Sequence, residues 1–149
     1  MSFSISNKVL ILLGAPALFV LGAATATALA PSAIFTPRLE TTKTIMDQPI
    51  VYPTSAPAKI TAGEVDLPPG GATGWHKHTI PVVGMILEGE LTVDYGSKGK
   101  RTFKQGDVFV ESINDTHRGT NTGSGTLRIY VVFVGAEGLP TSVPQNGPQ

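Results

Sequence analysis

The sequence contains no cysteine among its 149 residues. This absence excludes disulfide bonds, metal sites built from thiolates and catalytic cysteine nucleophiles. An excess of charge of one sign is also missing, because 11 basic residues balance 11 acidic ones. A balanced chain offers no electrostatic surface for a nucleic acid, so we expect no nucleic-acid partner. Long helix-forming runs are scarce, whereas 17 glycines and 12 prolines favour many short strands joined by turns.

One long apolar run is present near the N-terminus, where Lys8 precedes apolar residues 9–23 and small residues 24–30. This order is typical of a secretory signal peptide, whose candidate cleavage sites end at Ala26, Ala28 and Ala30. Residues 9–30 are also about long enough, at ~20 residues, for an uncleaved membrane anchor. In either case Lys8 stays inside and the rest of the chain faces outward. We therefore predict a signal peptide or membrane anchor over residues 1–30. The protein is then periplasmic or secreted, with an outward-facing, membrane-anchored protein as the alternative.

Strand signals dominate the remainder of the chain. Residues 31–57 are rich in proline and threonine and predict an extended lead-in, with one strand at 38–44 and a short one at 50–52. Further strands are predicted at residues 59–67, 82–87, 91–95, 101–104, 107–110 and 126–134. Many short strands separated by turns indicate a single all-β domain, a sandwich or a barrel, over residues 58–137. Residues 138–149 contain three prolines and no apolar period, which predicts a flexible tail.

The three histidines of the chain lie in two separate stretches. His76 and His78 flank Lys77, so a strand would direct both imidazoles to one face and Lys77 to the other. A third imidazole, from His117, would complete a facial set of metal ligands. A single histidine in a strand is usually a surface or satisfied polar residue. The spacing and the absence of any other histidine favour a metal centre at His76, His78 and His117 instead.

Two motifs around these histidines resemble those of the cupin superfamily. The first is Gly70-x5-His76-x-His78-x3-Val82-x6-Gly89. The second is Gly106-x5-Ser112-x-Asn114-x2-His117-x3-Asn121. The resemblance covers about residues 58–136. It implies an all-β, cupin-type jelly-roll β-barrel with one divalent transition metal near one end of its interior, and it does not distinguish iron, manganese, nickel and zinc.

The first motif departs from the family pattern at a metal ligand. Most metal-binding cupins use three histidines and a glutamate, and Val82 occupies the glutamate position here. The resemblance leaves two alternatives, a three-histidine centre with open positions or a carboxylate that enters from elsewhere. Glu111 precedes the Ser112 turn, and some cupins that lack the first glutamate resemble this pattern. Glu111 is therefore the candidate fourth ligand, and a solvated residue at a strand end is its alternative role.

The resemblance implies a domain that acts on or binds a small organic molecule. The first hypothesis is an enzyme, and a dioxygenase-like oxidoreductase is favoured over an isomerase or a lyase, for which Glu111 is the only candidate base. The second hypothesis is a non-catalytic, metal-dependent ligand-binding or sensing module. No catalytic residue is assigned. The expected partner is a small molecule, a homodimer is the assembly we consider, and any membrane contact would run through residues 9–30.

Other residues receive structural interpretations. We expect Trp75 to face away from the histidines, Arg118 to lie on the surface and Asn121 to support a turn. The apolar walls of the metal cavity are expected from Ile86, Val108, Val110, Leu127, Ile129, Val131 and Phe133.

Overall fold

The computed structural model describes residues 33–147. The signal peptide or anchor predicted over residues 1–30 lies outside the described residues. Within the described part, no helix is long and apolar enough to cross a membrane. Export and membrane anchoring therefore stay predictions.

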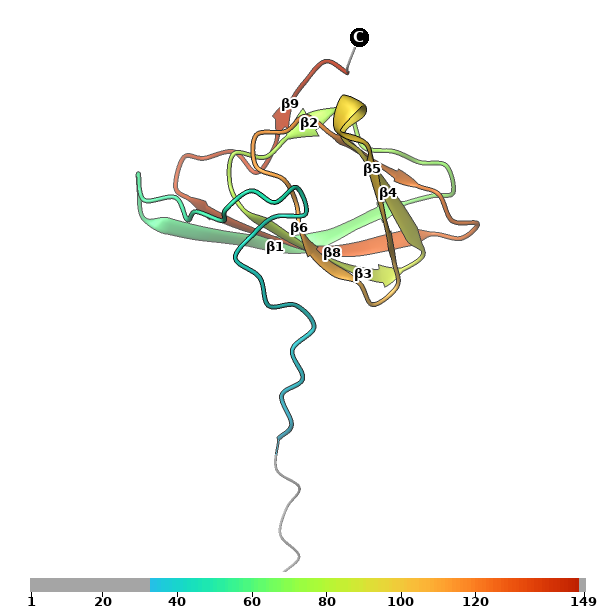
Figure 1. Ribbon diagram of the computed structural model, residues 1–149, viewed down its shortest axis with the longest axis horizontal. Coiled ribbons are helices and arrows are strands. Elements are labelled where there is room, and N and C mark those ends of the chain that lie inside the picture. Colours follow the sequence, from blue (N-terminus) through green and yellow to red (C-terminus); the bar gives the residue numbers. More distant parts are fainter. Residues whose placement is uncertain (1–32, 148–149) are drawn as a thin grey trace, which may run out of the picture. The chain divides into compact units, whose positions relative to one another are not determined.

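The described residues form strands and one 3-10 turn. The strands are β1 (Ala58–Leu67), β2 (His76–Lys77), β3 (Val82–Glu88), β4 (Glu90–Asp94), β5 (Lys100–Lys104), β6 (Val108–Val110), β7 (Arg118–Asn121), β8 (Leu127–Ala136) and β9 (Val143–Pro144), and the turn η1 is Gly96–Lys98. The sheet orders are β1-β8-β3-β6, β5-β4-β7 and β2-β9, and neighbouring strands are antiparallel. Figure 1 shows the four-stranded sheet facing the other strands across one interior. The predicted all-β jelly-roll barrel is confirmed.

The core lies between the two larger sheets and follows the alternation of their strands. In β8, Leu127 and Ile129 are buried while Arg128 and Tyr130 between and after them are exposed. Successive side chains of a strand point to opposite faces, so every second residue enters the interior. The buried cluster comprises Ile86, Leu91, Val93, Tyr95, Phe109, Leu127 and Ile129. Each such aliphatic side chain contributes about 1.5–3 kcal/mol by leaving water.

Strand β6 presents the opposite face from the one that we expected. Phe109 points inward, where its ring stacks on Phe103 with a centroid distance of 4.2 Å. Gly84 of β3 makes room for this ring, because a Cβ at Gly84 would lie 2.6 Å from Phe109 Cζ. Val108 and Val110 therefore face outward, and their prediction as walls of the metal cavity is wrong. Three consecutive apolar residues carry no alternation from which the inward face can be read.

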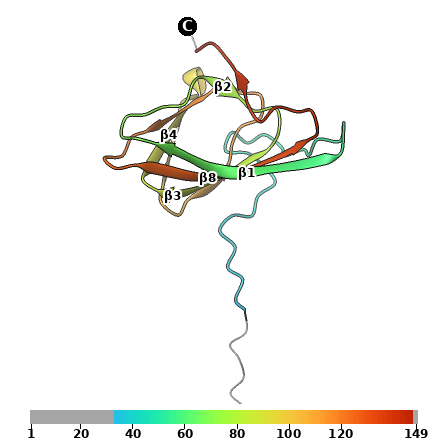
Figure 2. The same ribbon diagram turned by 180° about the vertical axis from the view of Figure 1, so that it is seen from behind.

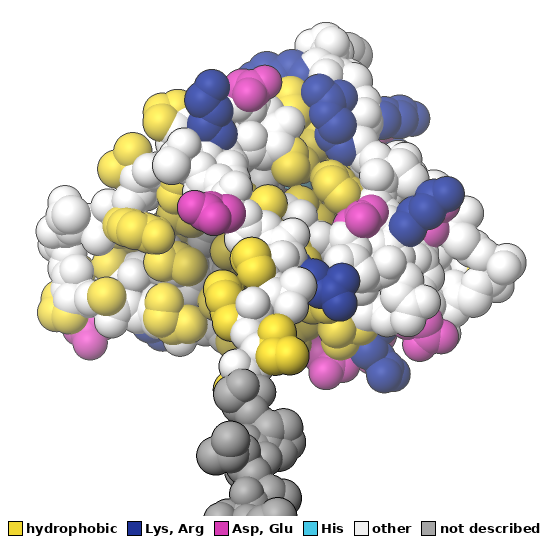
Figure 3. Space-filling view, turned by 60° about the horizontal axis from the view of Figure 1, so that its bottom comes forward, with side chains coloured by type: hydrophobic (Ala, Val, Ile, Leu, Met, Phe, Trp, Pro, Cys, Tyr) yellow, Lys and Arg dark blue, Asp and Glu magenta, His cyan; other side chains and the backbone are white. Residues whose placement is uncertain are grey.

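The part of the outer face of the four-stranded sheet that lies beside the lead-in is apolar (Figure 3). A groove of about 470 Å³ lies there between the lead-in and the sheet. Its lining includes Leu39, Ile50 and Tyr52 of the lead-in, together with Val83, Val108, Val110 and Val134 of the sheet. A contiguous apolar face of this kind is a common site of association. The homodimer stays a prediction.

The two strands predicted in the lead-in, at 38–44 and 50–52, are wrong. The described lead-in contains only an isolated bridge between Lys43 and Pro49, which encloses a turn. Threonine causes this, since Thr44 Oγ1 accepts hydrogen bonds from the main-chain nitrogens of Met46 and Gln48. Such local bonds compete with a strand ladder. The turn is attached to the barrel by a hydrogen bond of 2.9 Å from Ile45 N to Val110 O.

The C-terminal segment differs from the flexible tail predicted over residues 138–149. Val143–Pro144 form β9, which pairs with Lys77 and His76 of β2. Figure 2 shows this red segment beside β2 from behind. A strand of two residues is too short to produce an apolar period. Pro144 is tolerated because β9 is an edge strand, where a missing N–H costs little.

Asn121 supports the turn that follows β7, as predicted. Its side chain is 1% exposed and makes three hydrogen bonds. Nδ2 donates to the carbonyls of Leu67 and Gly125 at 2.9 and 2.8 Å, and Oδ1 accepts from Gly123 N at 3.0 Å. These bonds join the end of β1 to the β7–β8 turn.

Asn121→Ala should therefore destabilise the protein by about 2–4 kcal/mol, since it removes three hydrogen bonds made by a buried side chain and leaves their main-chain partners without them. Urea unfolding measures this change. Ser124→Ala in the same exposed turn serves as the control and should change the free energy of unfolding by less than about 0.5 kcal/mol. Equal stability of the two variants would contradict the structural role of Asn121.

Candidate metal centre

Two short segments bring the histidines together at one end of the barrel. His76 and His117 pair directly, with His76 N donating to His117 O at 3.0 Å and His117 N donating to His76 O at 2.8 Å. His78 lies two residues further along and is bridged to Ile113. All three imidazoles line one cavity, whereas Lys77 does not line it. The structure thus has the predicted alternation, in which His76 and His78 face the cavity and Lys77 faces away from it.

The three imidazoles converge on a common point. One ligand atom from each lies within 4.8 Å of the others, and the ring centroids are 4.5–5.2 Å apart. An ion with bonds of about 2.1 Å needs nitrogen ligands within about 4 Å of one another, so small ring rotations complete the contact. His78 and His117 are 3% and 1% exposed. These two imidazoles are therefore shielded from bulk water, whereas His76 is half-buried.

Main-chain carbonyls fix the orientation of every ring. The Nδ1 atoms of His76, His78 and His117 lie 2.8, 2.6 and 2.9 Å from the carbonyl oxygens of Gly74, Thr141 and Asp115. A carbonyl only accepts, so each Nδ1 carries the proton and leaves the Nε2 lone pair free for a metal. Nε2 of His117 is buried and has no hydrogen-bond partner among the described residues. The donor set thus fits a divalent transition metal.

Glu111 enters the same cavity from the strand beside Val82. Its main-chain nitrogen donates to Val82 O at 2.9 Å, which continues the register that pairs Val83 with Val110. Directly opposite residues of two paired strands point to the same face. Glu111 Oε2 therefore lies 2.7 Å from His78 Nε2 and 3.6 Å from His117 Nε2. A carboxylate occupies the place next to Val82, and its role as a metal ligand stays a prediction.

The cavity around these four side chains has a volume of about 80 Å³. A water molecule occupies about 30 Å³ in the liquid, so the cavity has room for two or three water molecules. Ile129, Val131 and Phe133 line it as expected, whereas Ile86 and Leu127 lie in the core cluster instead. The sequence did not indicate Val65, Thr73, Leu91 and Gly119, which also line it. The site can hold one ion together with the end of a small ligand.

Residues 63–133 match the family described as cupin domain. These residues therefore form a cupin domain. A search of curated proteins finds no match.

A solved structure agrees with this fold. The polyketide cyclase RemF from Streptomyces resistomycificus is 20% identical with a TM-score of 0.51, over 67% of this chain and 69% of that chain. An oxalate decarboxylase from Lactobacillus farciminis is 28% identical with a TM-score of 0.49. The alignment covers 57% of this cupin but only 26% of the decarboxylase, so the cupin spans about a quarter of that protein. A predicted oxalate decarboxylase from Thermotoga maritima is 30% identical with a TM-score of 0.44, over 49% of this chain and 64% of that chain.

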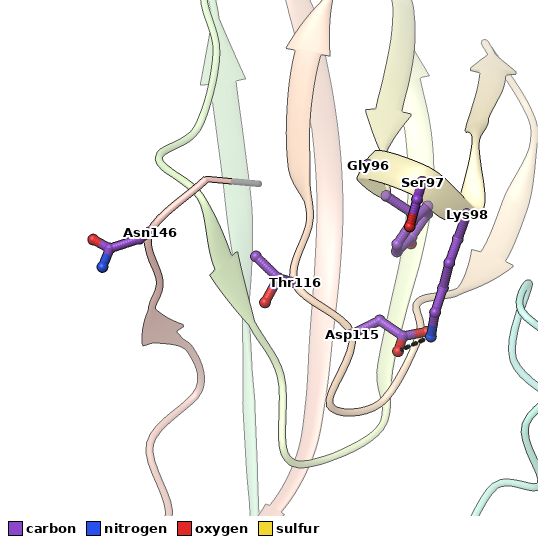
Figure 4. Close-up of a pocket in the computed structure, with 7 residues that line it drawn as sticks. Gly96, Ser97, Lys98, Asp115, Thr116 and Asn146 are labelled. Carbon is purple, nitrogen blue, oxygen red and sulfur yellow. Dashed lines mark hydrogen bonds and ion pairs between the residues drawn. The ribbon is translucent and has the colours of Figure 1, made fainter. Parts of the chain in front are cut away.

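The cupin holds the loop before His117 through two side chains outside the cavity. Gln48 Oε1 accepts from Ile113 N, and Gln48 Nε2 donates to Ile113 O, both at 2.8 Å. Lys98 Nζ lies 2.5 Å from Asp115 Oδ1 (Figure 4). Together they fix the loop whose Asp115 carbonyl orients His117. Sequence reasoning missed Gln48 because nothing in the sequence connects two turns 65 residues apart.

Trp75 and Arg118 lie together away from the cavity. The guanidinium carbon of Arg118 lies 5.0 Å from the centroid of a Trp75 ring, a cation–π contact. Arg118 is half-buried rather than on the surface as expected, because this contact holds it against the indole. Trp75 packs against protein, in agreement with its structural interpretation.

The electrostatics of the cupin site are set by its single carboxylate. Burial by itself would raise the pKa of Glu111, but the nearby imidazoles of His117 and His78 outweigh it and hold this pKa well below its usual range. Burial by itself would lower the pKa of His117, and Glu111 reverses this and raises it above the ordinary value. Burial lowers the pKa of His76. In the metal-free protein Glu111 therefore favours the protonated form of His117, and a metal at Nε2 would compete with that proton.

The metal-free protein should reveal this pair through pH. A raised folded-state pKa of His117 gives stability that is fully present below 6.5, the ordinary value, and is lost as the pH rises through the raised pKa. The excess stability of wild type over Glu111→Gln should therefore shrink as the pH rises above 6.5 through the raised pKa of His117. Urea unfolding in the presence of a chelator measures it. An excess that grows with pH would contradict the pairing.

Proposed function

We propose that this cupin is an exported, metal-dependent oxidoreductase of dioxygenase-like type that acts on a small organic molecule. The observation that carries the proposal is the convergence of three oriented imidazoles and one carboxylate on a cavity of about 80 Å³. The proposed ligands are His76, His78, His117 and Glu111. The apolar run at residues 9–30 supports export to the periplasm or the exterior.

The charges of the site favour an oxygen-donor substrate. Three neutral imidazoles and one carboxylate carry a charge of −1, so a divalent ion leaves the site positive and attractive to an anionic oxygen. A divalent metal bound there supplies a Lewis acid and, for iron, one-electron chemistry. The apolar walls, among them Val131 and Phe133, exclude water and strengthen these electrostatic interactions. The substrate end inside the cavity must be small.

Thr73 is placed to orient that substrate end. Thr73 lines the cavity, and its hydroxyl oxygen accepts a hydrogen bond of 3.0 Å from Gly119 N. The hydroxyl proton has no acceptor among the described residues, so it can donate to a ligand oxygen. Thr73 thus provides a hydrogen-bond donor that is independent of the metal ligands.

An isomerase or a lyase is less well supported because such a reaction needs a free general base. Glu111 is the one carboxylate among the residues that line the cavity, and it already contacts His78 and His117. A second candidate function is a non-catalytic, metal-dependent ligand-binding module. The small cavity favours it, because only the end of a ligand reaches the four side chains.

Elemental analysis and oxygen uptake test the proposal. The full chain is purified from its native compartment, its bound metals are measured, and oxygen consumption is followed with a panel of small diols, hydroxy acids and keto acids. Bound iron with substrate-dependent oxygen uptake supports the oxidoreductase. Zinc without uptake but with ligand binding supports the binding module. Absence of any bound metal contradicts both functions.

A further inference from the structure

The C-terminal segment Thr141–Gly147 lies against β2, the strand that carries His76. Thr141 O lies 2.6 Å from His78 Nδ1. Val143–Pro144 pair with β2 in antiparallel register. Gln145 N donates to Trp75 O at 2.9 Å. The segment therefore contacts residues 75–78, which include His76 and His78, at three successive places.

The chain reaches this position through a turn that directly follows β8. Leu139 N donates to Ala136 O at 3.1 Å, and Gly138 adopts a φ of +80° that favours glycine. The end of the segment packs on the indole, since a Cβ at Gly147 would lie 2.7 Å from Trp75 Nε1. The segment is thus seated by main-chain contacts and close packing.

We infer that the segment Thr141–Gly147 is a positioning element of the metal centre, and that its docking and metal binding are thermodynamically linked. The inference rests on the proposed metal-binding function. His78 is 3% exposed, and the Thr141 carbonyl is the hydrogen-bond acceptor that keeps its proton on Nδ1. Without this carbonyl the ring is free to rotate or to place its proton on Nε2, the atom that faces Glu111. Docking therefore prepares His78 for the metal.

Thermodynamic linkage makes the coupling between docking of the segment and metal binding reciprocal. If docking of the segment raises the affinity for the metal, the metal must stabilise the docked segment by the same factor. Trp75 reports on docking directly, because it is the one tryptophan in the chain and contacts both Gln145 and Gly147. Hydrogen exchange at Gln145 N provides a second reporter. Neither readout depends on enzymatic activity.

Gln145→Pro and Gln145→Ala in the full chain form a matched pair. Proline removes the N–H that binds Trp75 O, whereas alanine keeps it and loses only a side-chain bond to the adjacent Pro144 O. We expect Gln145→Pro to lower Zn²⁺ affinity about 10–100-fold, the range typical of groups that orient metal ligands. It should also shift Trp75 emission to the red and alter the Co²⁺ absorption spectrum. Gln145→Ala should match wild type, in which Zn²⁺ should slow exchange at Gln145 N.

The outcomes separate this inference from the proposed function. A variant with released Trp75 but wild-type Zn²⁺ affinity would overturn the positioning role. Wild-type protein that binds no Zn²⁺ would overturn the metal-binding function itself. If proline leaves Trp75 emission unchanged, deletion of residues 139–149 removes the segment outright, and retained affinity in that variant overturns the inference.

Discussion

Replacing His78 with alanine should lower metal affinity by about 100-fold or more. The expectation exceeds the 10–100-fold loss typical of groups that only orient a ligand, because a ligand itself is removed. His76→Ala and His117→Ala should behave alike, since all three rings are oriented in the same way by carbonyls. Elemental analysis after gel filtration should find metal in wild type and near-background amounts in each variant.

Lys77→Ala is the matched control for these variants. It lies between His76 and His78 in β2 but does not line the cavity, so its metal content should equal that of wild type. Added metal should raise the melting temperature of Lys77→Ala and leave the histidine variants unchanged, because binding stabilises only the folded state. Three histidine variants with wild-type metal stoichiometry would exclude this site.

Glu111→Gln should weaken metal binding by about 10–100-fold. Glutamine keeps the size of the side chain but removes the negative charge, which neutral imidazoles cannot replace. Titration of Zn²⁺ against a competing chelator at fixed pH measures the change. Glu88→Gln, at the exposed end of β3, is the control and should leave affinity unchanged. Wild-type affinity in Glu111→Gln would instead indicate a three-histidine centre.

The shared face of His76 and His78 was predictable because its signal is local. His76 and His78 are two residues apart, and a strand places such residues on one face. The place of Glu111 depends instead on the register between β3 and β6, which is set by pairs such as Val83 with Val110. Register is a tertiary property, and the sequence of either strand does not contain it. The family resemblance pointed to Glu111, and the pairing with Val82 supplies the physical reason.

Sequence reasoning missed contacts that the residue types involved do not indicate. Thr141 acts on His78 through its main-chain carbonyl, which every residue has, so no residue type marks the position. Strand β9 is two residues long and contains a proline, and neither property predicts a strand. In the lead-in, the hydrogen bonds that Thr44 Oγ1 accepts from Met46 N and Gln48 N outweighed strand propensity. The barrel follows from alternating apolar residues, whereas these contacts depend on the folded chain.

X-ray absorption spectroscopy of the Zn²⁺-loaded protein tests the metal centre most directly, because it counts and identifies the ligand atoms. We predict about one ion per chain with three imidazole nitrogens at about 2.0–2.1 Å and oxygen in the remaining coordination. The imidazole scattering should decrease in His117→Ala. A shell made of oxygen alone, or one with a single imidazole, would place the ion elsewhere on the protein and contradict the site formed by His76, His78 and His117.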